Sequence, residues 1–181
     1  RSELPVHTAD AHLHEAAAVA AQHRFFHWEL EFPEVFFDAG GEPLAARGFD
    51  AVLGNPPWDM VRGDAGEERE EARRLAAATV RFTRDSGVYV SQSDGHPNRY
   101  QLFLERAIAL ARPGGRIGLV LPAGLCTDHG SRRLRQALFE RCDVDRIAGF
   151  DNRRAIFPVH RSVRFVLLTA TAGSATQRIG C

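Results

Sequence analysis

The tetrad Asn55-Pro56-Pro57-Trp58 is the part of the sequence best suited to chemistry. An exocyclic aromatic amine is a weak nucleophile because its lone pair is delocalised into the ring. Two acceptors on its N–H groups favour a more pyramidal, more reactive nitrogen. The Asn55 side-chain carbonyl is one such acceptor, and the Pro56 backbone carbonyl is a candidate for the second. Trp58 offers a flat face on which a base can stack, an interaction worth about 1–3 kcal/mol.

The position of the tetrad supports this interpretation. It directly follows an apolar, β-prone run at residues 49–54, which predicts a buried strand that the two prolines end. In open α/β sheets, ligands bind at the carboxyl ends of strands. The alternative is a turn without chemistry, but such a tetrad arises by chance in about one of several hundred chains of this length. The sequence therefore favours a catalytic loop.

The tetrad and its strand resemble motif IV of the amino-group DNA methyltransferases, specifically the N6-adenine class. Three further segments extend the match to large type II restriction-modification adenine methylases. Residues 25–36 look like the segment before motif IV in that family. Residues 98–116 are similar to its motif V helix and the turn that follows, and residues 151–162 look like its motif VIII region. The resemblance runs from about residue 25 to about residue 170.

The resemblance implies S-adenosylmethionine as methyl donor and an adenine flipped out of double-stranded DNA as acceptor. By match to the family, the tetrad is catalytic: Asn55 and Pro56 hold the amino group, and Trp58 stacks on the base. Phe157 matches the motif VIII aromatic that packs against the flipped base. Phe103 matches the motif V position that lines the cofactor's adenine, and Asn55 also faces the cofactor. For both phenylalanines, an ordinary core position is the alternative.

The same tetrad leaves other acceptors open. Methylation of cytosine N4 or of a protein glutamine requires a similar planar amine or amide. An inactive remnant that only binds nucleic acid is the non-enzymatic alternative. The motif VIII match and the basic second half favour DNA, whereas the DNA recognition sequence is not predicted.

The fold implied by the resemblance is α/β, a partial Rossmann-like methyltransferase sheet that is mostly parallel with an antiparallel last strand. Three parts are expected: a helix and aromatic-rich connector (1–48), the C-terminal part of the catalytic domain (49–172) and a tail (173–181). The sequence patterns predict helices and strands by periodicity and punctuation. Helices are expected at 9–24, 67–81, 99–111 and 130–141, strands at 49–54, 116–121, 144–150 and 162–169, and a loop at 86–97.

The family's glycine-rich cofactor loop has no match before residue 49. We therefore expect the chain to be the later part of a longer enzyme, with the N-terminal part as a further partner. The edge of the strand at residues 49–54 would then be unpaired. An exposed apolar edge favours self-association, so a marginally stable or oligomeric fragment is expected.

The charge of the chain is unevenly distributed. Residues 1–95 hold 9 arginines and 17 acids, a net charge of −8, whereas residues 96–181 hold 14 arginines and 6 acids, a net charge of +8. The basic half suits contact with phosphates, or forms solvated helix faces around Arg132, Arg133 and Arg135. The chain has no lysine. This excludes a P-loop nucleotide site, a Schiff-base enzyme and the common carboxylate-plus-lysine nucleases.

Other groups of potentially reactive residues do not indicate a functional site. The three cysteines are few and widely spaced, so neither a disulfide framework nor a metal site is expected. His12 and His14, or His23 and His27 on one helix face, lack further ligands, and no metal is expected. Asp128-His129 near Ser131 lacks a nucleophile elbow. No membrane-spanning run or signal peptide is recognised, so a cytoplasmic location is expected.

Overall fold

The computed structural model describes residues 6–23, 26–59, 69–92 and 97–179. The chain divides into two compact units, Arg1–Leu44 and Ala45–Cys181. The first unit contains the helix α1 (Val6–His23), which confirms the predicted N-terminal helix. The predicted connector contains two short helices, α2 (Trp28–Glu31) and α3 (Pro33–Phe36). Their aromatic rings contact one another, with Trp28 and Phe32 stacked at a centroid distance of 6.0 Å.

The second unit is built on a four-stranded sheet with the order β1-β2-β4-β3. The strands are β1 (Phe49–Gly54), β2 (Ala111–Pro122), β3 (Cys142–Asp151) and β4 (Arg164–Ala172). β1 is parallel to β2, and β4 is antiparallel to both of its neighbours. β1, β2 and β3 therefore run in one direction, and only β4 opposes them. The predicted α/β class with an antiparallel last strand is confirmed.

The helices of this unit are α4 (Arg69–Asp85), α5 (Arg99–Leu110), α6 (Gly124–Thr127) and α7 (Arg132–Arg141), with a 3₁₀ turn η1 (His129–Ser131) before α7. α5 confirms the predicted helix almost to the residue. α4 continues four residues beyond its predicted end at position 81, and the first two predicted positions lie outside the described residues. The helix predicted at 130–141 is divided between η1 and α7.

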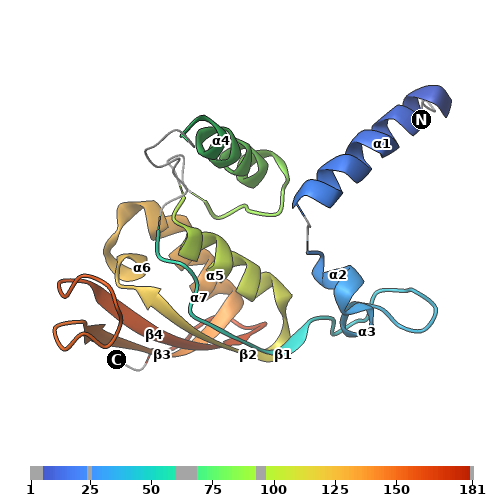
Figure 1. The fold of residues 1–181 in the computed structure, drawn as a ribbon. Helices are drawn as coiled ribbons and strands as arrows, with labels where there is room; N and C mark the ends of the chain where they lie inside the picture. The colour runs from blue at the N-terminus through green and yellow to red at the C-terminus, as the bar shows by residue number, and fades with distance from the viewer. Residues whose placement is uncertain (1–5, 24–25, 60–68, 93–96, 180–181) are drawn as a thin grey trace. The chain divides into compact units, whose positions relative to one another are not determined.

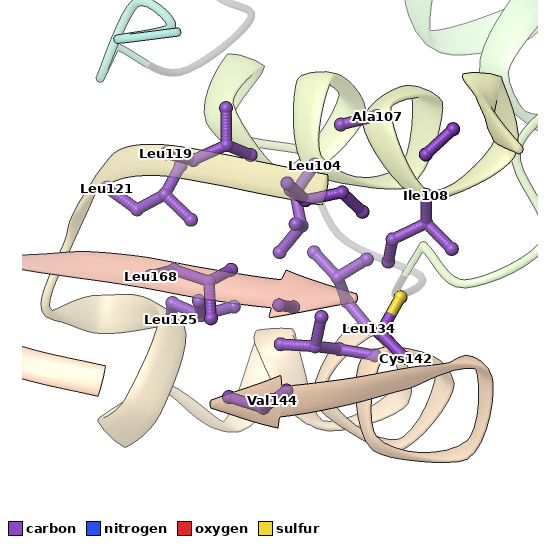
Figure 2. Close-up of a cluster of buried hydrophobic side chains, with 14 of the residues drawn as sticks. Leu104, Ala107, Ile108, Leu119, Leu121, Leu125, Leu134, Cys142, Val144 and Leu168 are labelled. Carbon is purple, nitrogen blue, oxygen red and sulfur yellow. The ribbon is translucent and has the colours of Figure 1, made fainter. Parts of the chain in front are cut away.

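The core lies between one face of the sheet and the helices α5 and α7, which run along that face in Figure 1. α5 turns Leu104 and Ile108 inward, one helical turn apart, so both are buried. Leu134 and Leu138 repeat this spacing on α7. They meet alternate residues of the strands, among them Leu168, as Figure 2 shows. This packing fixes the strand ends from which the candidate site is built.

β1 forms the edge of the sheet in the part of the chain that the structure describes, as expected. The prediction that it is buried is wrong, because no residue of β1 is buried and the helices cover one face of the sheet alone. Leu53 is 78% exposed, and its side chain lies over Gly118 of β2, on the face opposite the helices. Leu167, on that same face, is 39% exposed. The predicted self-association of the chain remains a prediction.

The junction of α5 and β2 is tighter than predicted. β2 begins at Ala111, immediately after α5, rather than at residue 116. The register passes from the pair Phe49–Ala111 to the pair Ala51–Arg116, so residues 112–115 bulge between them. A Cβ on Gly48 would lie 2.6 Å from the Leu110 backbone oxygen, so glycine is required at the entry to β1. The Pro-Gly-Gly run is thus a strand bulge and not a separating turn.

Candidate active site

Three segments meet at one end of the sheet, where β1 and β3 end and β4 begins; this end is called the sheet edge of the site below. The tetrad follows β1, the loop 152–163 follows β3, and β4 begins at the same edge because it is antiparallel to β3. Trp58 and Phe157 are far apart in the sequence, yet their ring centroids are 5.5 Å apart with an interplanar angle of 69°. The sheet thus brings together the two aromatic residues that the sequence assigns to base binding.

The tetrad leaves β1 as an extended segment. Asn55 and Pro57 are exposed, Pro56 is buried and Trp58 is half-buried. The Trp58 indole Nε1–H donates to Asn55 Oδ1 at 3.1 Å. Because an indole N–H only donates, the oxygen of the amide must face Trp58. A carbonyl oxygen accepts two hydrogen bonds, so this contact fixes the orientation of the Asn55 oxygen and leaves it a second acceptor position.

Asp59 ties the end of the tetrad to the first residue of α5. The Arg99 backbone N–H donates to the Asp59 carbonyl oxygen at 2.9 Å. The Arg99 Nε atom also lies 3.4 Å from Asp59 Oδ2. Both side chains are about half exposed, so this ion pair contributes little stability by itself. Its effect is to fix where the tetrad ends relative to the helix.

Four rings form an aromatic cluster at this edge: Trp58, Phe150, Phe157 and Phe165. Phe165 is 4% exposed and contacts the other three, with centroid distances of 5.0 Å to Phe157, 5.4 Å to Phe150 and 6.0 Å to Trp58. Phe150 and Phe165 are paired across β3 and β4, and their rings stack with an interplanar angle of 11°. All three centroid distances lie within the range in which aromatic rings attract each other. Phe165 is therefore the shared platform of the cluster.

Phe150 and Phe165 were not predicted as site residues from the sequence. Both flank the motif VIII segment, one just before it and one just after it. A hairpin around that segment would have paired them and turned both to one face of the sheet. The predicted strands at 144–150 and 162–169 already contained this signal.

The loop 152–163 is organised by its first residue. Asn152 is 0% exposed, and its side-chain amide bonds to the loop backbone. Oδ1 accepts from the Phe157 N–H at 2.9 Å, while Nδ2 donates to the carbonyl oxygens of Phe157 at 3.1 Å and Val159 at 2.9 Å. The Asn152 backbone N–H donates to the Val163 oxygen at 3.0 Å. Phe157 is half-buried in this loop, where its ring packs against Phe165.

Phe103 is 53% exposed on α5, so the alternative that it is a core residue is wrong. α5 buries Leu102 and Leu104 on either side of it and leaves the Phe103 ring at the surface. An exposed aromatic ring fits the flat face of an adenine base. Asn55 is also exposed, at the end of β1. Both residues that the resemblance assigns to the cofactor are therefore exposed.

Burial raises the pKa of two side chains in the core. Desolvation raises the pKa of the Cys142 thiol from 9.0 to about 11. Desolvation also raises the pKa of Tyr100, whose hydroxyl shares a hydrogen bond of 3.1 Å with Ser131 Oγ. Ser131 is 0% exposed and accepts a second bond from Gln101. Both bonds tie Ser131 to α5, so its hydroxyl helps to hold α5 against the start of α7.

The remaining charged candidates are structural or lie elsewhere. Arg135 Nη1 donates to the Leu125 and Asp128 backbone oxygens at 2.8 Å, so it braces α6 against α7, whereas Arg132 and Arg133 are exposed. The prediction that His23 and His27 share a helix face is wrong, because His27 has an extended backbone and is the N-cap of α2, outside α1. Within the described ranges, no group of three or more potential ligands could hold a metal ion. No helix described by the structure is long and apolar enough to cross a membrane.

Comparison with known proteins bears on the same segments. A family model described as Eco57I restriction-modification methylase matches residues 3–157, which includes the tetrad and Phe157. The chain belongs to this methylase family. A methylase of the Eco57I family takes its methyl group from S-adenosylmethionine, the cofactor expected from the sequence. No curated protein matches the chain.

Several solved structures resemble the chain in part. A modification subunit of a putative type I restriction enzyme from Vibrio vulnificus YJ016 has 19% identity and a TM-score of 0.46, covering 71% of this chain and 24% of its own length. The type I restriction enzyme EcoKI M protein has 20% identity and a TM-score of 0.46, covering 70% and 21%. A putative class I S-adenosylmethionine-dependent methyltransferase from Listeria monocytogenes has 14% identity and a TM-score of 0.47, covering 76% and 36%. The chain thus spans about a third or less of these proteins.

Proposed function

We propose that the chain contributes the target-base half of an enzyme that methylates the N6 amino group of an adenine flipped out of DNA. The observation that carries the proposal is the meeting of Asn55, Trp58 and Phe157 at one sheet edge. Family membership supports a methylase in a restriction-modification setting. The adenine target rests on the resemblance of the tetrad and of the loop 152–163 to the motifs of adenine methylases.

Asn55 and Pro56 supply the two acceptors for the amino group. The Trp58 N–H holds Asn55 Oδ1 at 3.1 Å, so the acceptor is oriented before the substrate arrives. Pro57 follows Pro56 directly and restricts the backbone that presents the Pro56 carbonyl. When both N–H groups of the amine donate hydrogen bonds to these acceptors, the nitrogen lone pair becomes more available for attack. Preorganised groups of this kind contribute to catalysis because they need no reorganisation during the reaction.

The base is to be stacked on Trp58 and contacted by Phe157. These two rings touch each other at a centroid distance of 5.5 Å, so a base that enters between them must displace one ring. Phe165 stays beneath as a buried platform. Exposed arginines of the same loop, Arg154 and Arg161, would meet the phosphates beside the flipped nucleotide.

S-adenosylmethionine supplies an electrophilic methyl group when it is bound. Phe103 would line its adenine ring, and Asn55 would stand between the cofactor and the base. Because the donor is a positively charged sulfonium, the amine needs little help from a general base. The rest of the cofactor site is expected in an N-terminal part of the same enzyme, which would also cover the open edge of β1.

The test is transfer of labelled methyl groups from S-adenosylmethionine to unmethylated DNA by the full-length gene product. The expected product is N6-methyladenine in digested DNA. Asn55→Ala is expected to reduce the rate by at least about 100-fold, as for other preorganised catalytic hydrogen-bonding groups. Gln177→Ala also removes a side-chain amide, at an exposed position beyond the end of β4 and therefore at the other end of the sheet, and is expected to match wild type.

The products separate the alternatives. Label in N4-methylcytosine or in protein glutamine would replace the adenine assignment with one of the other acceptors. Cofactor binding without transfer to any of the three, or no binding at all, would leave the nucleic-acid-binding remnant. Equal rates for Asn55→Ala and wild type would remove Asn55 from the chemistry.

A further inference from the structure

Asn152 is the most completely bonded polar side chain at the sheet edge. It is 0% exposed, although asparagine is a residue that ordinarily lies at the surface. It stands where β3 has ended, at the start of the loop that carries Phe157. A buried polar side chain is tolerated only when its donors and acceptors are satisfied, so its partners show what it holds.

The partners of Asn152 converge on one residue of the site. Oδ1 accepts from the Phe157 backbone N–H at 2.9 Å, and Nδ2 donates to the Phe157 backbone oxygen at 3.1 Å. The Asn152 side chain therefore forms hydrogen bonds with both the N–H and the C=O of Phe157. The second Nδ2 hydrogen is directed to Val159 at 2.9 Å, with His160 at the limit of bonding at 3.5 Å.

The backbone of Asn152 closes the base of the loop. Its N–H donates to the Val163 oxygen at 3.0 Å, and its carbonyl oxygen accepts from the Ala155 N–H at 2.8 Å. Ala155 has a φ of 53°, in the left-handed region that non-glycine residues rarely adopt. The loop therefore holds an unfavourable backbone conformation that its other bonds must stabilise.

We infer that Asn152 is a positioning residue for the target base, acting through Phe157. It fixes the backbone of Phe157 so that the ring meets Trp58 and Phe165 at 5.5 Å and 5.0 Å. A ring on a loop without this anchor would sample many orientations before it could contact a base. This inference rests on the proposed function, in which Phe157 contacts the flipped adenine.

Asn152→Asp isolates the donor role of the amide. One carboxylate oxygen can still accept from the Phe157 N–H, but the other replaces Nδ2 and faces backbone oxygens at 3.1 Å and 2.9 Å. These contacts become repulsive, and the loop loses its anchor. Gln177→Glu is the matched control, because it makes the same amide-to-carboxylate change at an exposed position beyond the end of β4.

The experiment measures kcat/KM for DNA methylation by the full-length enzyme with Asn152→Asp, Phe157→Ala and the double variant. Asn152→Asp and Phe157→Ala are each expected to lower kcat/KM by about tenfold, in line with the loss of base stacking. The double variant is expected to lie within about twofold of Phe157→Ala, because a residue that acts through Phe157 has nothing left to position. Gln177→Glu is expected to match wild type.

A second readout needs no activity. Trypsin can cut after Arg153, Arg154 and Arg161, which are exposed in this loop. Asn152→Asp is expected to speed cleavage there at least about tenfold without changing the thermal unfolding of the rest of the enzyme. If Asn152→Asp gives no cooperative unfolding, Asn152→Ser, which adds no charge, takes its place in both experiments.

The outcomes separate this inference from the proposed function. Multiplicative losses in the double variant, or an Asn152→Asp enzyme as active as wild type, would overturn the positioning role. If the wild-type enzyme transfers no methyl group to DNA adenine, the proposed function fails, and trypsin alone decides whether Asn152 orders the loop. Unchanged cleavage in Asn152→Asp would then overturn the anchor as well.

Discussion

Phe165→Leu is expected to weaken both the stability and the activity of the protein, because it removes the shared platform of the aromatic cluster. Leucine keeps an apolar side chain of similar size at a position that is 4% exposed, so no polar group is buried. What is lost is the ring that contacts Phe150, Phe157 and Trp58 at centroid distances of 5.4, 5.0 and 6.0 Å.

The magnitude follows from these three contacts. An aromatic pair contributes about 0.5–1.5 kcal/mol beyond the apolar area that it buries. Phe150 is 41% exposed, which places its contact at the low end of this range. Together the three contacts make a loss of about 2 kcal/mol in the free energy of unfolding. For a domain of about this length, that corresponds to a fall in Tm of about 4–8 °C.

The assay combines urea unfolding with methyl transfer to DNA. Phe139→Leu is the matched control, because Phe139 packs partly buried against the main core and lies outside the aromatic cluster. We expect Phe165→Leu to reduce methyl transfer by about tenfold at temperatures where it stays folded, since Trp58 and Phe157 lose a common support. The reasoning would be refuted if Phe165→Leu unfolded and methylated like Phe139→Leu.

Two further predictions concern the frame of the site. Gly48→Ala is expected to destabilise the protein by about 2 kcal/mol or more, because Gly48 has a φ of +118° and its Cβ would lie 2.6 Å from a backbone oxygen. Gly149→Ala, with nothing within 4 Å, is expected to stay within about 0.5 kcal/mol of wild type in thermal unfolding. The raised pKa of Cys142 means that the folded state holds the thiol proton more tightly than the unfolded state, so stability should fall as pH rises from 9.0 to about 11. Cys142→Ala should unfold with a shallower loss over that range, and an equally steep loss would show that other groups cause it.

The end of β1 before the tetrad was predictable because the signal for it lies in adjacent residues. Two prolines after an apolar run end a strand whatever surrounds them, and β1 ends at Gly54 as expected. The exposure of β1 was less accessible to a local argument. Composition says that Leu53 is apolar, but whether a neighbouring strand covers it depends on sheet order, which no single segment encodes.

The features missed in the sequence depend on register. Phe150 and Phe165 lie in predicted strands, yet their stacking follows from β3 and β4 pairing with those two residues opposite each other. Asn152 reads as a turn residue, because asparagine favours turns. Its burial becomes evident only when the loop folds over it. The bulge at residues 112–115 likewise reflects a pairing with β1 that the Pro-Gly-Gly run alone does not indicate.

β4 lies between β2 and β3 in the sheet, and this position imposes an order on folding. In the described sheet, β2 and β3 do not pair with each other, and both pair with β4, which follows them in the sequence. A nascent chain that ends before Arg164 can pair β1 with β2, but β3 then lacks its partner strand. The apolar residues of β3 stay exposed and can bind chaperones. Phe165 opens that last strand, so the aromatic cluster is completed late. The contacts of Phe165 with Phe157 and Trp58 would therefore form only after all four strands of this sheet have been synthesised.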